Sequence, residues 1–300
     1  MLVKTFAGAV NGIEASTVTI EVNISPGIRF FLVGLPDNAV KESQQRIESS
    51  FRSAGFRWPG KQVVINMAPA DIRKEGSSFD LSLAVGILAA NEFVVRSELS
   101  RYILMGELSL DGTLKPVKGI LSVAMQARVD GFKGIIVPKD NSKEASIVSG
   151  LDVYGMDHLS NVVDFFNGMV QFETVNVDID DLFLQDGNQY SLDFSDVKGQ
   201  TSVKRAFEVA AAGGHNIILI GPPGAGKTML AKRMPTIVPP LTVEEALETT
   251  KIHSVAGKLD NNRSLMTQRP FRSPHHTISN IALVGGVSNP QPGEITYGYI

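Results

Sequence analysis

The sequence contains no cysteine, and this absence removes two classes of protein. Without thiols it can hold neither a disulfide framework nor a thiolate metal site. Long apolar runs are missing too: no stretch reaches the roughly 18 uninterrupted apolar residues that a membrane-spanning helix needs, and the amino end lacks the apolar core of a signal peptide. We therefore expect a cytoplasmic protein with no membrane partner.

Strong net charge is also missing. The 28 Lys and Arg side chains nearly balance the 31 Asp and Glu side chains, so the net charge is −3 and gives no global electrostatic reason to expect nucleic acid. The 300 residues suffice for about two domains. Residues 171–195 contain six acidic and no basic side chains, and we expect them to form a solvated acidic linker between the domains.

The first part of the chain alternates strand-like and helix-like segments, which predicts a mixed α/β domain. Short stretches rich in β-branched and aliphatic residues predict six strands. They are Thr17–Asn23, Arg29–Val33, Gln62–Met67, Leu104–Leu108, Gly134–Val137 and Leu151–Tyr154. Three helices are predicted as well, the first capped by Asp37 or Asn38. The other two cover Phe79–Ala90 and Ile120–Val129.

The strongest chemical signal is the stretch GPPGAGKT, which matches the phosphate-binding pattern G-x-x-x-x-G-K-[ST]. It follows an apolar predicted strand, Asn216–Ile220, and precedes a helix-like run, Met229–Met234. In such a loop, glycines turn backbone N–H groups towards a phosphate, Lys227 reaches the β- and γ-phosphate oxygens, and Thr228 offers its hydroxyl to Mg²⁺. The predicted residues for ATP with Mg²⁺ are Gly221, Pro222, Pro223, Gly224, Ala225, Gly226, Lys227 and Thr228.

The residues before this loop, VKGQ and then a predicted helix over Ser202–Ala212, resemble the entry to an AAA+ module. By this resemblance, Val197, Lys198 and Gly199 lie on the adenine side of the nucleotide. The basic side chains of this region are expected to be solvated or to face another subunit. They are Lys204, Arg205, Lys232 and Arg233.

A stretch further along, RPFRSPHHTISNIALVGGVSNPQPGEITYG, resembles the signature of the magnesium-chelatase-like AAA+ ATPases. It contains Arg269, Arg272 and the adjacent pair His275 and His276. The histidines do not predict a metal site, because neighbours on an extended chain point to opposite faces and no third ligand stands at a suitable spacing.

Three strings in the first domain resemble the amino-terminal domain of the YifB/ComM family, which has the fold of the Lon protease domain. They are VGLPDNAVKES, NMAPADIRKEGSSFDLSLAVGIL and GELSLDGTLKPVKGI. The resemblance covers nearly the whole chain and implies a Lon-like mixed α/β domain over residues 1–170, a linker over 171–195 and the first part of a P-loop AAA+ domain over 196–300. The chain departs from the family at Ile72-Arg73, where Leu-Pro is usual, and at Ser82, where Pro is usual.

The Lon likeness raises the question of peptidase activity, since Lon-type peptidases use a serine with a lysine as its base. By the resemblance, the serine position falls on Ser78 and the lysine position on Leu121. Leucine cannot accept a proton, and Lys118 lies three residues earlier, in a turn. We therefore expect no peptidase activity, with Ser78 at the start of a helix and Asp80 in its first turn.

The acidic strand required for hydrolysis is missing from the sequence. P-loop ATPases need a second apolar strand ending in carboxylates that hold Mg²⁺ and polarise the attacking water. No apolar run ending in Asp-Glu follows residue 228. In the family this strand comes soon after PGEI, and the sensors, the arginine finger and the helical lid follow it. We expect a truncated form that binds nucleotide weakly and does not hydrolyse it.

The resemblance implies a function for the complete protein: a hexameric, ATP-driven motor that acts on branched DNA during recombination and natural transformation. Two alternatives remain. One is a protein-remodelling or magnesium-chelatase-type assembly ATPase, and the other is a non-catalytic binding module. The Lon-like domain favours the motor, because the family fuses that domain to the ATPase module and the chelatase subunit lacks it.

Overall fold

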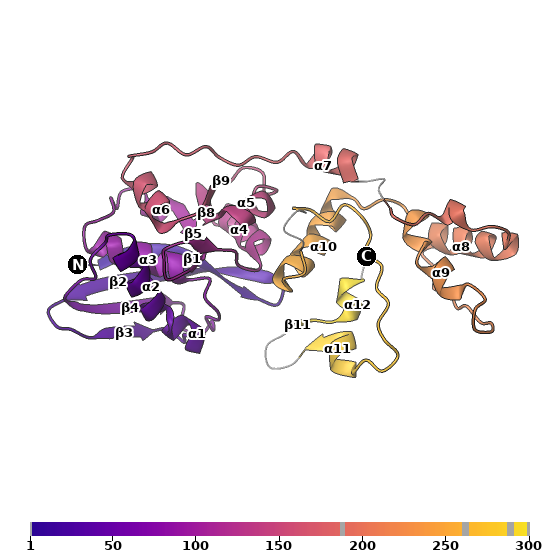
Figure 1. Ribbon diagram of the computed structural model, residues 1–300, viewed down its shortest axis with the longest axis horizontal. Helices are drawn as coiled ribbons and strands as arrows, with labels where there is room; N and C mark the ends of the chain where they lie inside the picture. The colour runs from indigo at the N-terminus through magenta and orange to yellow at the C-terminus, as the bar shows by residue number, and fades with distance from the viewer. Residues whose placement is uncertain (1, 187–189, 260–263, 287–290, 299–300) are drawn as a thin grey trace. The chain divides into compact units, whose positions relative to one another are not determined.

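The protein forms two compact units, seen in a computed structural model that describes residues 2–186, 190–259, 264–286 and 291–298 (Figure 1). The first unit consists of Met1–Val177 and His253–Ser264, and the second of Asp178–Ile252 and Leu265–Ile300. The chain therefore returns to the first unit after it has entered the second. Nothing in the sequence pattern suggested this return, and the domain limits expected at residues 170 and 196 stay a prediction.

A seven-stranded sheet forms the centre of the first unit, in the order β3-β4-β2-β1-β5-β8-β9. Strand β2 is antiparallel to both β1 and β4, and all other neighbours are parallel. The mixed α/β fold class is confirmed. The strands are β1 (Leu2–Asn11), β2 (Glu14–Ser25), β3 (Phe30–Val33), β4 (Gln62–Ala68), β5 (Tyr102–Leu104), β8 (Gly134–Pro138) and β9 (Asp152–Met156), with a separate hairpin of β6 (Glu107–Leu108) and β7 (Leu114–Lys115).

The predicted strands of this unit form, with one division, and two strands, β1 and the short β7, were not predicted. The strand predicted over Leu104–Leu108 is divided into β5 and β6, because the N–H of Gly106 donates to the carbonyl of Ser78 and not to a neighbouring strand. Strand β1 was not predicted, since its Ala-Gly-Ala centre interrupts the apolar alternation. Those small residues have a packing reason: a Cβ atom on Gly8 would lie 2.5 Å from the side chain of Val123.

Helices pack on the sheet of the first unit. Helix α3 (Asp80–Ala90) packs against β1 and β2 and is buried at every position, and α4 (Ile120–Val129) packs against β1, β2 and β8. The helix predicted after Asp37 forms in two pieces, and the Asp37 carboxylate caps the first by accepting the Val40 N–H at 2.8 Å. The remaining helices are α1 (Asn38–Lys41), α2 (Ser43–Ser53), α5 (Lys139–Ala145) and α6 (Leu159–Phe166).

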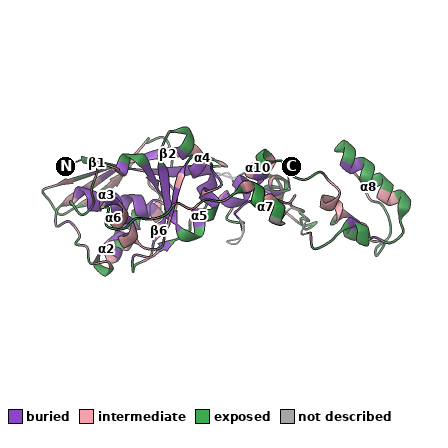
Figure 2. Cartoon of the chain, turned by 90° about the horizontal axis from the view of Figure 1, so that it is seen from above, coloured by how far each residue is buried: buried purple, intermediate pink, exposed green. Residues whose placement is uncertain are grey.

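The second unit has a smaller interior. Its core cluster consists of Phe194, Val197, Phe207 and Leu230, and its helix α8 is mostly exposed, in contrast to the buried sheet of the first unit (Figure 2). Its helices are α7 (Ile179–Asp186), α8 (Thr201–Gly213), α9 (Lys227–Ala231), α10 (Val243–Val255), α11 (Asn280–Val284) and α12 (Glu294–Tyr297), and its strands are β10 (Gly285–Gly286) and β11 (Gln291–Pro292). The last three residues of α10 belong to the first unit. Helix α7 lies within the stretch that was expected to be a plain linker.

Membrane-spanning segments were sought among the helices of the described ranges. None of those helices combines the length and the apolar character that crossing a bilayer requires.

Candidate nucleotide-binding loop

The segment that leads into the phosphate-binding motif is extended, but it is not a strand. The prediction of a strand over Asn216–Ile220 is therefore wrong. The alternation of a strand is kept: Ile217 and Leu219 pack against the core cluster, whereas Ile218 and Ile220 are 82% and 89% exposed. A strand needs a neighbour to take its backbone hydrogen bonds, and no described part of the second unit pairs with this segment.

The motif itself forms a loop that ends where α9 begins, at Lys227. Gly224 and Gly226 have φ values of +80° and +82°, which side-chain-bearing residues adopt only with strain. These two glycines therefore set the path of the loop. The predicted helical run Met229–Met234 forms as α helix only as far as Ala231, and a short 3₁₀ turn follows it.

The amine of Lys227 closes over its own loop. Its Nζ donates to the carbonyl oxygens of Gly221 and Pro222, at 2.8 and 2.7 Å. A hydrogen bond from an ammonium group to a charged phosphate oxygen is stronger than one to a neutral carbonyl, so the exchange of partners favours an anion. The exposed hydroxyl of Thr228 follows in the first turn of α9, where a metal held on a phosphate could be reached.

The predicted adenine-side residues stand close to α9, the helix that follows the loop, because Val197 and a residue of α9 share one core cluster. Val197 is buried there together with Leu230 of α9, and Lys198 and Gly199 are exposed beside it. The amine of Lys204 donates to the carbonyl of Val197. The structure therefore places one predicted adenine-side residue, Val197, in the same core cluster as the helix that follows the loop, with its side chain in the core.

Arg233, near the loop, has a structural role that was not expected from the sequence. It was expected to be solvated or to face a subunit, but its side chain is 13% exposed and donates to the carbonyls of Asp193 and Met229, at 3.0 and 3.2 Å. It also pairs with the Asp196 carboxylate at 3.3 Å. These contacts join the end of α9 to the chain before α8. The pairing could have been predicted only from the acidic residues at 193 and 196, which stand shortly before α8 in the sequence.

The two ends of the RPFR–PGEI signature meet in the second unit. Arg272 forms a two-pronged ion pair with Glu294, at 2.6 and 2.7 Å, and lies over the ring of Tyr297. Arg269 donates to the carbonyl of Pro239 at 2.8 Å and pairs with Glu245 at 3.2 Å. One of these ion pairs therefore joins two segments of the signature, and the other ties the signature to α10.

The two histidines of the signature stack on each other, with ring centroids 4.2 Å apart. The Nδ1 atom of His275 lies 2.7 Å from the hydroxyl of Thr277. Among the residues that the structure describes, no group of three or more His, Cys, Asp or Glu side chains is placed to hold a metal ion.

The two positions expected from a Lon-type dyad lie in the first unit. Ser78 was expected at the start of a helix and stands two residues before the first residue of α3, whose N-cap residue is Phe79. Asp80 does begin α3, but its carboxylate accepts two bonds from Arg46, at 2.6 and 2.9 Å, and one from the Leu108 N–H at 3.2 Å. Leu121 is fully buried in α4.

Two family models match the chain. The model of magnesium chelatase subunit ChlI matches residues 193–299, and a second model, subunit ChlI of Mg-chelatase, matches residues 20–141. The competence protein ComM of Haemophilus influenzae is 41% identical over 98% of this chain, and the YifB protein of Escherichia coli is 43% identical over 96% of it. The chain is homologous to the ComM/YifB proteins over nearly its whole length. It spans 56–58% of the length of these two relatives.

The first unit has a further resemblance outside the ComM/YifB family. The Lon protease of Brevibacillus choshinensis is 28% identical over 53% of the chain, which corresponds to 23% of that protease. The chain therefore combines a Lon-like mixed α/β unit with a magnesium-chelatase-like AAA+ segment.

Proposed function

We propose that the second unit binds ATP with Mg²⁺ through the loop at residues 221–228. The observation that carries the proposal is the loop itself: two glycines in left-handed conformation, followed by Lys227 at the first position of α9. This loop lies inside the segment that matches the magnesium chelatase model. Magnesium chelatase and AAA+ relatives use nucleotide and Mg²⁺, and the residues of this chain suit both.

Each residue of the loop has a distinct task in this proposal. The backbone N–H groups of the glycine-rich turn surround the β-phosphate, Lys227 neutralises charge on the β- and γ-phosphates, and Thr228 contributes an oxygen ligand to Mg²⁺. Val197, Lys198 and Gly199 approach the adenine side. Bound Mg²⁺ would supply further neutralisation of the phosphate charge.

For the whole protein we propose an ATP-driven, ring-forming motor that acts on branched DNA. The name of the Haemophilus relative, a competence protein, supports a role in DNA uptake or recombination. A protein-remodelling or chelatase-type assembly ATPase is the second candidate, supported by the two ChlI models. For this chain alone we propose nucleotide binding without turnover, because no apolar run ending in Asp-Glu follows the loop in its sequence. We also propose a cytoplasmic location.

Binding of a fluorescent ATP analogue in the presence of Mg²⁺ tests the nucleotide site. We expect Lys227→Ala to weaken binding at least about tenfold, since an ammonium–phosphate hydrogen bond contributes about 1.5–3 kcal/mol. Lys232→Ala is the matched control, because Lys232 is an exposed lysine just after α9. Equal affinity of the wild type and Lys227→Ala would contradict the proposal, and steady ATP turnover by this chain would show that a catalytic carboxylate has been overlooked.

The DNA-directed role is tested with the whole protein. A gel shift of branched DNA that weakens as salt rises would support the motor, because contacts with phosphates release counterions. Absence of binding at low salt, where such contacts are strongest, would favour the protein-remodelling candidate.

A further inference from the structure

The seven-stranded sheet of the first unit has two outer strands, β9 and β3, and their open sides differ (Figure 1). At β9 an extended part of the same chain lies along the edge. The Val175 N–H donates to the Val153 carbonyl at 2.8 Å, and the Phe172 ring lies 6.2 Å from the ring of Phe165. No described residue pairs with the outer side of β3. We propose that β3 is a docking edge for an extended acidic segment of a partner protein, which adds to the sheet as a further strand.

The backbone of β3 offers hydrogen bonds on its outer side. Strand β3 is parallel to β4, with Phe30 opposite Val63. The Val63 N–H donates to the Arg29 carbonyl at 2.9 Å. Because successive residues of a strand turn their backbone groups to opposite sides, Phe31 bonds to β4, whereas Phe30 and Leu32 direct their N–H and carbonyl groups away from it. A partner strand can pair with these outward groups.

The side chains around this edge are apolar and open to solvent. Phe31 and Val33 lie on one face of β3 and are 42% and 48% exposed. Ile28 and Leu35, just before and just after the strand, are exposed as well. Proteins commonly protect an edge strand with a charged side chain, a proline or a bulge, and Phe30–Val33 contains none of these. A strand added beside β3 would cover part of this apolar surface.

The charge of the edge identifies the chemistry of the partner. The two segments that form the edge, residues 26–35 and 56–67, contain Arg29, Arg57 and Lys61 and no acidic side chain. These three basic side chains are exposed, and the structure describes no ion pair for any of them. Opposite charges on neighbouring strands attract and like charges repel, so the edge favours an acidic strand over a basic one.

The length of β3 makes this charge important. A strand of four residues forms few backbone bonds, so a partner needs side-chain contacts as well. Alternate side chains of a strand point to opposite faces. A segment that alternates acidic and apolar residues can therefore pack its apolar side chains beside Phe31 and Val33 while its carboxylates approach the basic side chains. The chain's own residues 172–175 are engaged at β9, so the segment at β3 comes from another molecule.

Fluorescence anisotropy of labelled peptides with the full chain tests the proposal. The probes are two peptides of equal length, one alternating Glu and Val and the other alternating Lys and Val. At low salt, where charges are least screened, we expect the acidic peptide to bind at least about tenfold more tightly. Arg29→Glu combined with Lys61→Glu should reverse this preference. Equal affinity for the two peptides, or no binding of the acidic peptide by the wild type, overturns the proposal.

Hydrogen exchange distinguishes strand addition from a loose attraction of charges. With the acidic peptide bound, exchange at the Phe30 and Leu32 amides should slow at least about fivefold, whereas the Phe31 amide, which bonds to β4, should change less. Leu32→Pro removes an outward N–H and leaves the bonds to β4 in place, so it should weaken binding at least about fivefold. Binding without slower exchange at Phe30 and Leu32 overturns strand addition.

The matched control for the charge reversal is Lys115→Glu combined with Arg128→Glu, which changes the net charge equally at exposed positions on other elements. This control should keep the wild-type preference, and its loss would mean that the overall charge, not the edge, selects the peptide. Analytical ultracentrifugation of the chain alone tests for a second copy at the edge: a dimer that Leu32→Pro dissociates overturns the acidic partner. Circular dichroism shows which variants fold, and if Leu32→Pro does not, the charge reversal and the wild-type exchange pattern decide.

Discussion

The first unit encloses its sheet under helices such as α3, in which every residue is buried, whereas in the second unit the segments that flank the loop at residues 221–228 pack on a core cluster of four buried side chains. The more specific chemical motif thus lies in the less enclosed unit. A phosphate loop needs only a local backbone path, which Gly224 and Gly226 provide. A sheet needs partners from distant parts of the chain.

Ion pairs show the same contrast. The two-pronged pair of Arg46 and Asp80 in the first unit has a carboxylate that is 1% exposed. The two-pronged pair of Arg272 and Glu294 in the second unit leaves 34% of the arginine exposed. Similar geometry therefore stands in two different environments, and the cost of breaking each pair should differ accordingly.

The largest expected effect is a core truncation in the first unit. Phe51→Ala should lower the free energy of unfolding by about 3–5 kcal/mol, because Phe51 is fully buried. The single tryptophan, Trp58, lies 5.9 Å from the Phe51 ring, so its fluorescence during urea unfolding reports on this unit. Phe31→Ala, at a half-exposed position on edge strand β3, is the control and should cost less than about 1 kcal/mol. Equal losses would contradict the described packing.

The second-largest expected effect is the loss of unfolding free energy when either ion pair is broken. Asp80→Asn should cost about 3 kcal/mol, because it leaves the Arg46 guanidinium without its counter-charge in a largely buried place. Glu294→Gln should cost about 1 kcal/mol, since solvent screens the more exposed pair. Thermal unfolding followed by circular dichroism measures both. A larger loss for Glu294→Gln would reverse our view of the two units.

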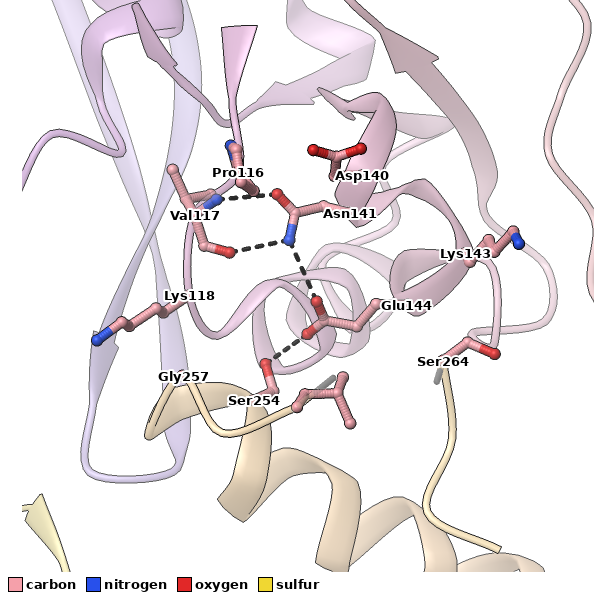
Figure 3. A pocket seen from close by; sticks show the side chains of 11 residues that line it. Pro116, Val117, Lys118, Asp140, Asn141, Lys143, Glu144, Ser254, Gly257 and Ser264 are labelled. Carbon is pink, nitrogen blue, oxygen red and sulfur yellow. Dashed lines mark hydrogen bonds between the residues drawn. The ribbon is translucent and has the colours of Figure 1, made fainter. Parts of the chain in front are cut away.

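A smaller effect depends on pH and arises at Glu144 of α5, whose buried carboxylate accepts hydrogen bonds from Asn141 and Ser254 (Figure 3). Burial raises the pKa of the Glu144 carboxyl above its ordinary value of 4.5. Between pH 4.5 and the raised pKa, the folded protein binds this proton more readily than the unfolded chain does. The stability that proton binding at Glu144 contributes is therefore lost as pH rises through this range. The slope should not exceed about 1.4 kcal/mol per pH unit.

The control for the pH effect is Glu144→Gln, which cannot titrate. Unfolding of the wild type and Glu144→Gln in urea, measured at intervals from pH 4.5 to 8, should show the wild type losing stability relative to the variant as pH rises. A relative gain with rising pH would mean that the folded state stabilises the charged form of Glu144.

The smallest expected effect lies in the extended segment before the loop. Ile218→Ser should change the free energy of unfolding by no more than about 0.5 kcal/mol, because the side chain is exposed. Leu219→Ser, at the neighbouring position that packs on the core cluster, should cost more. Urea unfolding of the second unit, followed by circular dichroism, measures both. Equal costs would show that the in-and-out alternation of this segment has no energetic meaning.

Much of the fold could be predicted from local pattern. The helices at α3 and α4 and the strands at β2, β4 and β8 follow from apolar runs, and the cap at Asp37 follows from its residue type. Strand β1 could not be predicted in this way. Its centre is small because the side chain of Val123, from a helix distant in sequence, packs directly against it. The strand over Asn216–Ile220 failed for the opposite reason, since its pattern is right and no described neighbour pairs with it.

The sequence by itself determined the phosphate loop, because the left-handed glycines and the lysine that follows them act within eight neighbouring residues. Only the tertiary structure decided where Arg233 points, how Arg272 finds Glu294, and that Ser254 lies against Glu144. Those contacts join residues up to 110 positions apart. They form because burial makes an unmatched charge or hydroxyl costly, a condition that exists only once the chain has folded around it.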